Sequence, residues 1–339
     1  MRLLRYCAWR LLEMLFVMLG TVAIVFLIAR VVPGDPARTL GGPDAREEQL
    51  DQIRREYGLD RPLVVQFGSY LWGLMSRGDL GRSIRTQRPI SQDLAAYFPA
   101  TFELTTVAMA LALGIGIGLG VAAAVWRGSW IDHATRIFAV SGVSLPLFWI
   151  GLLLQVVVGY WIGWLPLNGR LQPSLSMESR TSKWTGLLLA DSLLSGNWIV
   201  FQSAAKHLVL PALTLSIAAV CQIMRVSRTA MLQVLGEDYL RTAVAKGLSS
   251  RVVILRHALK NALLPVITVI GLSYSFLLGG SFLVEAVFDW PGLGLYATGS
   301  LFAVDFTALL GVALVFSATR ALMSLLVDLA YYWLDPRIE

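Results

Sequence analysis

The chain has 339 residues, of which 56% are hydrophobic and only 15% are charged, against roughly a quarter in soluble domains. A soluble protein of this length could not bury so much apolar surface in one core. Its apolar runs approach the ~20 residues that cross a ~30 Å hydrocarbon layer as a helix. The composition therefore excludes an ordinary soluble class and indicates an all-α integral membrane protein.

The formal net charge of +6 could suggest a nucleic-acid partner. In a membrane protein the stronger explanation is the excess of Lys and Arg in cytoplasmic loops, so we expect no nucleic acid. Cys7 and Cys221 fall in or beside apolar helices and form no CxxC motif. We interpret both cysteines as packing residues and expect neither a disulfide framework nor a metal site.

The chain opens on MRLLRYCAWR, which places three arginines before the first apolar run. This start is similar to the n-region of a signal peptide. However, the run is long, and VVPGDP follows it where a small-residue cleavage site would be expected. The pattern favours an uncleaved signal anchor over a cleaved signal peptide.

We predict six transmembrane helices, and the polar segments between them define the rest of the organisation. The predicted spans are residues 11–32, 101–125, 137–161, 208–231, 263–284 and 308–334. The predicted divisions are 1–32 (tail and first helix), 33–100 (extracytoplasmic segment), 101–334 (membrane core with a cytoplasmic loop at 232–262) and 335–339 (cytoplasmic tail).

Two extracytoplasmic segments are long. In the first, residues 47–57 have helical spacing, which predicts a small external subdomain between the first two spans. The second, 162–207, contains the apolar stretch 185–201, but Asp, Ser, Gly and Asn residues interrupt it too often for a lipid-exposed helix. We therefore prefer six spans to seven, since a seventh would also place the bases of 225–261 outside.

The orientation follows from those bases. The 285–306 loop has three acidic residues and no Lys or Arg, which is typical of the outer side. Both termini are therefore expected in the cytoplasm. The 225–261 segment holds Arg225, Arg228, Arg241, Lys246, Arg251, Arg256 and Lys260 against only Glu237 and Asp238.

Two features inside the spans stand out. The run ALGIGIGLGVAAA contains two overlapping GxxxG pairs, which predict close helix packing; no Gly-Lys-Ser/Thr follows, so it is not a nucleotide loop. Arg320 lies near mid-membrane, where a charge costs at least ~3 kcal/mol. It either pairs structurally, with Asp328 or a carboxylate of another subunit, or lines a wet substrate path, for which Glu103 is the second candidate. The packing glycines are Gly114, Gly116, Gly118 and Gly120.

Catalytic constellations are weak. His133, His207 and His257 fall in three separate loops, and Ser144 has no nearby His or Asp to activate it. We expect a chain that is not an enzyme.

The stretch EDYLRTAVAKGLSSRVVILRHALKNALLP (237–265) is polar, basic and patterned as a short helix. Tyr239, Leu240, Ala243 and Val244 form an apolar stripe, Asp238 is an N-cap candidate, and Gly247 suits the position just past the helix end. A solvated basic loop would explain the charge but not the stripe. The stripe needs a groove, on another subunit or on another part of the chain.

This stretch resembles the cytoplasmic EAA loop of ABC importer permeases of the dipeptide/oligopeptide/nickel (DppB/OppB-like) subfamily. Similar short patterns recur nearly end to end: RVVPGDP (30–36), PATFELT (99–105), SLPLFWIGLLL (144–154), HLVLPALTL (207–215), VEAVFDWPGLGLY (284–296) and LVDLAYYWLDPRI (326–338). There are departures. Arg241, Thr242 and Ala243 occupy the Glu-Ala-Ala slots, Val244 stands where a base is frequent, and Arg320 stands at an expected apolar position.

The resemblance implies an ABC type I importer permease fold in a bacterial inner membrane. It also implies a second homologous permease, two cytoplasmic ATPase subunits carrying ATP and Mg, and an extracytoplasmic substrate-binding protein, with no cofactor on this chain. Peptides are the first expectation for the cargo. The residues implied in ATPase coupling are Asp238, Tyr239, Arg241, Thr242, Ala243, Ala245, Lys246, Gly247, Arg256, His257, Asn261 and Pro265.

Two other classes remain open. A secondary transporter or channel is expected to carry inverted repeats or intramembrane acidic residues for ion coupling, and neither is evident. A membrane-embedded enzyme lacks a catalytic set.

Overall fold

The computed structural model describes residues 2–31, 36–42, 45–56, 58–178 and 184–334, so most of VVPGDP and the predicted tail 335–339 lie outside the described residues. Across those ranges the regular elements are helices, apart from one bridge pair between Arg82 and Pro89. The chain forms two compact units. The first is Met1–Pro99 with Pro291–Ala321, and the second is Ala100–Trp290 with Leu322–Glu339.

In the first unit, α4 of the predicted extracytoplasmic segment packs against α1 and α15. Val22 and Phe26 of α1 are buried with Leu310 of α15, and Phe67 and Leu71 of α4 pack against them. The predicted helix near 47–57 is α3. The elements of this unit are α1 (Arg2–Val31), α2 (Pro36–Gly41), α3 (Glu47–Glu56), α4 (Leu63–Arg77), the start of α5 (Ile90–Val125), α14 (Leu293–Phe302) and the first part of α15 (Phe306–Leu334).

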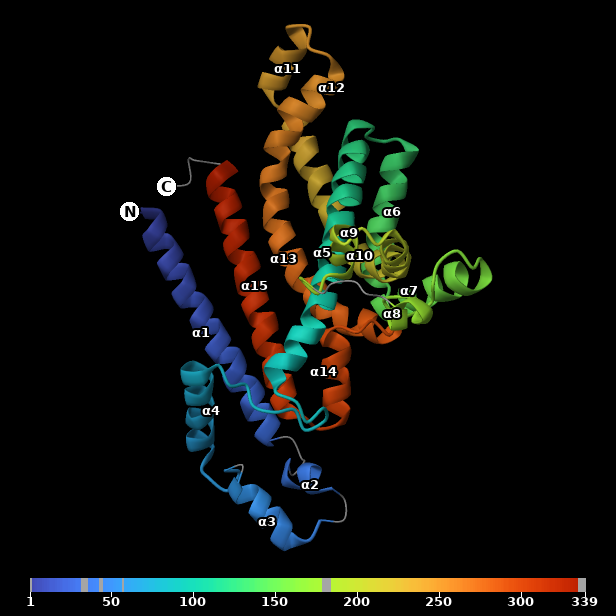
Figure 1. Ribbon diagram of the computed structural model, residues 1–339. Helices are drawn as coiled ribbons and strands as arrows, with labels where there is room; N and C mark the ends of the chain where they lie inside the picture. The colour runs from blue at the N-terminus through green and yellow to red at the C-terminus, as the bar shows by residue number, and fades with distance from the viewer. Residues whose placement is uncertain (1, 32–35, 43–44, 57, 179–183, 335–339) are drawn as a thin grey trace. The chain divides into compact units, whose positions relative to one another are not determined.

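The second unit is built around α10, which packs against α13, α6 and α7. The apolar stretch of α10 is 72% buried. Its short helices α11 and α12 lie at one end of α13 (Figure 1). Besides the rest of α5 and α15, it contains α6 (Trp130–Ser144), α7 (Leu147–Leu154), the π-helix η1 (Gln155–Trp161), α8 (Pro173–Glu178), α9 (Leu188–Leu194), α10 (Trp198–Leu235), α11 (Asp238–Ala245), α12 (Ser250–Val252), the π-helix η2 (Val253–Ala258) and α13 (Leu259–Val287).

Within the described residues, 4 helices are long and apolar enough to cross a membrane, or up to 5 if one bent pair counts as a span. They correspond to the second, fourth, fifth and sixth predicted spans. In α1 the apolar part is the shorter Leu12–Ile28, so the count of six stays a prediction. The four are Ile90–Val125, Trp198–Leu235, Ser250–Val287 and Phe306–Leu329.

The third predicted span, 137–161, is not one continuous helix. α6 and α7–η1 meet at an angle of 108° around Leu145 and Pro146. Pro146 has no backbone N–H to continue the helix and disfavours the helical conformation of the residue before it; Leu145 is extended, with φ −90° and ψ 137°. The prediction of an uninterrupted third span is therefore wrong, and the apolar run is divided by its proline.

The apolar stretch 185–201 is also divided, as its polar interruptions predict. α9 ends at Leu194, and a turn leads to Asn197, whose side-chain oxygen accepts a hydrogen bond from the N–H of Val200 at 3.2 Å. Asn197 thereby caps the start of α10. No helix runs through these residues as a seventh span.

Candidate functional site

The helix α11 ends in a turn that fixes its length. Gly247 has φ +80°, a left-handed conformation that glycine adopts without strain. Its N–H bonds the carbonyl of Val244 at 2.9 Å, and the N–H of Leu248 bonds that of Ala243 at 3.3 Å. This pair of bonds is the Schellman motif, which satisfies the last helical carbonyls. Gly247 therefore stands just past the helix end, where the sequence predicts it.

The start of α11 differs from the prediction. Glu237, not Asp238, holds the extended N-cap position, and neither side chain caps the helix. Asp238 is the first helical residue, where its charge suits the positive end of the helix dipole. Its carboxylate accepts a hydrogen bond from Nη1 of Arg241 at 3.2 Å. The N-cap assignment of Asp238 is thus wrong by one residue.

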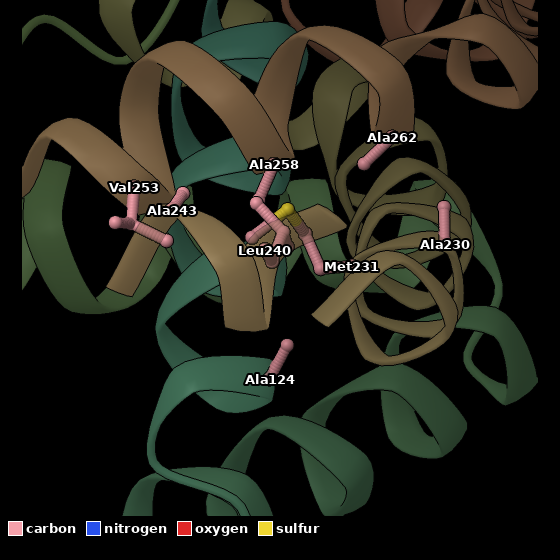
Figure 2. Close-up of a cluster of buried hydrophobic side chains, with 8 residues drawn as sticks. All are labelled: Ala124, Ala230, Met231, Leu240, Ala243, Val253, Ala258 and Ala262. Atoms are coloured by element: carbon pink, nitrogen blue, oxygen red, sulfur yellow. The ribbon is translucent and has the colours of Figure 1, made fainter. Parts of the chain in front are cut away.

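The inner side of α11 is anchored within the chain. Leu240 and Ala243 are 3% and 9% exposed and belong to a cluster of small and apolar side chains. Figure 2 shows Met231 and Ala258 close to Leu240 at its centre. We call this set the anchor cluster: Ala124 of α5, Ala230 and Met231 of α10, Leu240 and Ala243 of α11, Val253 and Ala258 of η2, and Ala262 of α13.

The anchor cluster divides the predicted stripe. Tyr239 and Val244 are 42% and 60% exposed, whereas Leu240 and Ala243 are covered by their own chain. The expectation that Ala243 lies on the contact surface is therefore corrected, because its methyl group faces the anchor cluster. The outer side of the helix and its turn, which we call the docking face, consists of the exposed residues Asp238, Arg241, Thr242, Val244, Ala245, Lys246 and Leu248.

Two hydrogen bonds join α11 to η2 and α13. Nδ2 of Asn261 donates to Oη of Tyr239 at 2.7 Å, and that hydroxyl donates to the carbonyl of His257 at 3.3 Å. The return itself is made by η2, which continues directly into α13. Arg256, which precedes His257 in the chain, is exposed. Pro265 lies inside α13, not at its start. Tyr239, His257 and Asn261 thus contact one another within the chain.

The glycines of α5 fall on two different sides. A Cβ on Gly116 would lie 3.0 Å from Ile223, and one on Gly120 would lie 2.7 Å from the carbonyl oxygen of Met224. Only glycine allows α10 to approach this closely. A Cβ on Gly114 or Gly118 would meet nothing within 4 Å.

A buried ion pair between α6 and α10 was missed from the sequence. Asp132 of α6 accepts from Nε and Nη2 of Arg228 at 2.7 and 3.1 Å and from the N–H of Gly128 at 3.0 Å. Arg136 adds a longer ion pair at 3.5 Å. In the sequence Arg228 counts only as one of the cytoplasmic bases. The one signal was an acidic residue in the otherwise basic loop at 126–136.

The two candidates for a translocation path have different surroundings. Glu103 is buried, and its Oε2 accepts from Nε of Arg170 at 3.1 Å while its Oε1 accepts from the N–H of Leu189 at 2.7 Å. The guanidinium of Arg170 also lies 5.7 Å from the ring centroid of Trp290. These contacts give Glu103 an anchoring role for the 162–207 segment. Arg320 is exposed on α15. A place on the path remains a prediction for both.

Two protein-family models match most of the chain. Residues 116–339 match the family described as binding-protein-dependent transport system inner membrane component, and residues 3–105 match the N-terminal family of the same systems. The chain is 47% identical over 336 residues to the probable D,D-dipeptide transport system permease protein DdpB of Escherichia coli K12, covering 99% of this chain and 97% of the relative.

Two further relatives extend the range. The dipeptide transport system permease protein DppB of Alkalihalophilus pseudofirmus is 40% identical, covering 99% of this chain and 100% of the relative. The glutathione transport system permease protein GsiC of Salmonella choleraesuis is 38% identical, covering 99% of each.

The chain belongs to the family of binding-protein-dependent transport system inner membrane components. Within that class it is an ABC importer permease of the DppB-like subfamily, so the resemblance seen in the 237–265 stretch is confirmed. Its sequence-based prediction as an all-α membrane permease is confirmed with it.

Proposed function

We propose that this permease forms half of the translocation pathway of an ATP-driven importer of peptides, with short peptides such as dipeptides as the cargo. The support for the cargo is that its relatives are named for D,D-dipeptide, dipeptide and glutathione transport. The chain is the non-catalytic partner in this proposal, and ATP and Mg are bound by two ATPase subunits. A second, homologous permease completes the pathway, and a substrate-binding protein delivers the cargo outside.

The observation that carries the coupling part of the proposal is the two-sided character of α11. Its inner side is fixed by the anchor cluster to α5, α10 and α13, and its outer side leaves Val244, Arg241 and Lys246 exposed. A short helix capped at its C-terminus and packed against three long helices transmits a displacement, whereas a flexible loop would absorb it. The ATPase is therefore expected to bind the docking face and to move the long helices through the anchor cluster.

The other residues predicted for ATPase coupling or for the translocation path have separate roles in this proposal. Tyr239, His257 and Asn261 hold the angle of α11, and Gly247 supplies the turn. Arg256 flanks the docking face, and Glu103 and Arg320 are the weaker candidates for the pathway. Both termini and the docking face lie in the cytoplasm, in agreement with the distribution of Lys and Arg.

The proposal is tested by purifying the chain with its partners and measuring ATP hydrolysis. We expect an ATPase to copurify, and its hydrolysis rate to rise when binding protein and a dipeptide are added together. Uptake that persists when the ATPase is inactivated would contradict the proposal and favour a secondary transporter, whose uptake should then follow an ion gradient.

A further inference from the structure

An open cavity of ≈ 270 Å³ lies between α10 and α13 in the second unit. Five of its lining residues are on α10, and the sixth, Pro265, is on α13. Ala230 belongs both to the cavity wall and to the anchor cluster, so the cavity directly adjoins the support of the docking helix. The lining residues are Arg225, Val226, Thr229, Ala230, Gln233 and Pro265.

The cavity lies along a polar stripe on α10, a helix that is otherwise largely apolar. Gln222, Arg225, Thr229 and Gln233 are spaced three, four and four residues apart, which places them on one side of the helix. Arg225, Thr229 and Gln233 are exposed, although the apolar stretch of α10 is 72% buried. Such a stripe is costly against lipid, so it is expected to face a water-filled space or a polar partner.

Arg225 differs from its neighbour Arg228. Arg228 is occupied by Asp132 at 2.7 Å, and this pair fastens α6 to α10. Arg225 is exposed on the cavity wall and, among the residues that the structure describes, pairs with no carboxylate. It lies within the helix, because α10 continues to Leu235, a further ~15 Å along the helix axis. Its guanidinium is therefore available to bind an anionic ligand in the cavity.

We propose that this cavity is the cytoplasmic-side subsite of the translocation path and that Arg225 binds the carboxylate end of the transported peptide. This inference rests on the proposed peptide cargo. A guanidinium offers a planar pair of donors that matches a carboxylate, and it does so better than a Lys ammonium. Thr229 and Gln233 line the same wall and can accept or donate hydrogen bonds to the peptide backbone. The volume lies just below the range of about 300–1,000 Å³ for whole small-molecule sites, which suits the end of a short peptide.

The experiment compares two cargoes in the reconstituted importer with its ATPase and binding protein. Uptake of a dipeptide and of the same dipeptide with a C-terminal amide is measured for the wild type, Arg225→Gln, Arg225→Lys and the control Arg251→Gln. Arg251 is an exposed base of the same cytoplasmic loop that does not line the cavity. The ratio of free-acid to amide uptake is the readout, because any preference of the binding protein enters every variant equally.

We expect Arg225→Gln to lower the free-acid to amide ratio about tenfold, which corresponds to the loss of about 1.4 kcal/mol of carboxylate binding. Amide uptake should stay within about twofold, Arg225→Lys should be intermediate, and Arg251→Gln should keep the wild-type ratio. An equal fall for both cargoes would overturn the inference and assign Arg225 to a lipid headgroup or a partner subunit. An unchanged ratio would overturn it as well. A wild type that hydrolyses ATP in response to binding protein but carries neither cargo would instead refute the peptide cargo of the proposed function, and this inference with it.

Discussion

Two regions of the second unit are held in place by opposite means. The docking helix α11 is anchored by small apolar side chains, whereas the 162–207 segment is anchored by charges: Glu103 binds Arg170, and Asp191 binds the 184–186 turn. The anchor cluster holds α11 to α5, α10 and α13 by many close-packed, non-directional contacts, so the docking helix moves together with these helices. A buried ion pair holds one geometry, since separating its charges leaves each without a partner. We therefore expect α11 to move with the helices that it packs against when a partner binds, and the 162–207 segment to stay fixed.

The largest effect is expected at the docking helix itself. Replacing Gly247 by Val puts a β-branched residue at φ +80°, where strain of about 1–3 kcal/mol opposes the turn. Uptake should be abolished while the permease remains inserted and folded. The measurement is transport together with ATPase copurification.

A matched control is Ser249→Val in the same loop, because Ser249 is extended, with φ −64° and ψ 146°, and exposed. Valine adopts this extended conformation without strain, and the Ser249 side chain makes no capping hydrogen bond that would be lost, so transport should be retained. Normal assembly and transport in the Gly247 variant would remove the coupling role of this turn.

The ion pair between Glu103 and Arg170 is tested by removing one of its charges. Arg170→Gln leaves the buried Glu103 without its cation, which costs about 3–5 kcal/mol in comparable buried pairs. The 162–207 segment should then become accessible to protease, whereas the docking loop should keep its wild-type protection.

The double variant Glu103→Gln with Arg170→Gln should recover part of that loss, because no unpaired charge remains buried. Protease sensitivity that is equal in the single and double variants would argue against a charge-based anchor.

A third test addresses the support beneath the docking helix. Gly120→Ala places a Cβ 2.7 Å from Met224 and Ser227, and overpacking of this kind costs about 1–3 kcal/mol. Gly118→Ala meets nothing within 4 Å and should be neutral or slightly stabilising. Thermal unfolding in detergent should separate the two variants, and equal midpoints would show that α5 and α10 do not need this close approach.

The smallest expected effect is a pH dependence of the contact between Asp191 and the 184–186 turn. Burial alone would raise the pKa of Asp191, but hydrogen bonds from the Thr185 hydroxyl and from the N–H groups of Thr185 and Gly186 outweigh it and hold the pKa below its ordinary value. Because the folded pKa is the lower one, the stabilisation is present above the ordinary value of about 3.9 and is lost as pH falls through the folded pKa.

Hydrogen exchange of the 185–191 turn should therefore stay slow at neutral pH and accelerate only in acid. Asp191→Asn should abolish this additional acid-induced acceleration. Acceleration between pH 5 and 7 in the wild type would contradict the assignment.

The sequence predicts the apolar features, α11 and the long spans, much better than it predicts the buried ion pairs. The helix α11 and its terminal Gly247 follow from spacing alone, and four long spans follow from the length of their apolar runs. The inward side of Ala243 does not, because the anchor cluster that it joins also contains Ala124 of α5, which is distant in the sequence. Glu103 and Arg170 are 67 residues apart, and Asp132 and Arg228 are 96 apart, so no local pattern pairs them.

The broken third span is an intermediate case. Pro146 is visible in the sequence, but proline is also tolerated inside long membrane helices, as Pro99, Pro211 and Pro265 show here. Whether a proline divides a span depends on the packing of its neighbours. The sequence therefore indicates a possible break without predicting the 108° bend.

The central claim is that the ATPase binds the outer side of α11 while the inner side belongs to the permease. It is tested most directly by cross-linking in the assembled importer, with single cysteines introduced at Val244 and at Leu240 in a background lacking the native cysteines. The account predicts that Val244→Cys, on the docking face, cross-links to the ATPase, and that Leu240→Cys, in the anchor cluster, does not. Cross-linking from Leu240→Cys but not from Val244→Cys, or from neither, would contradict it.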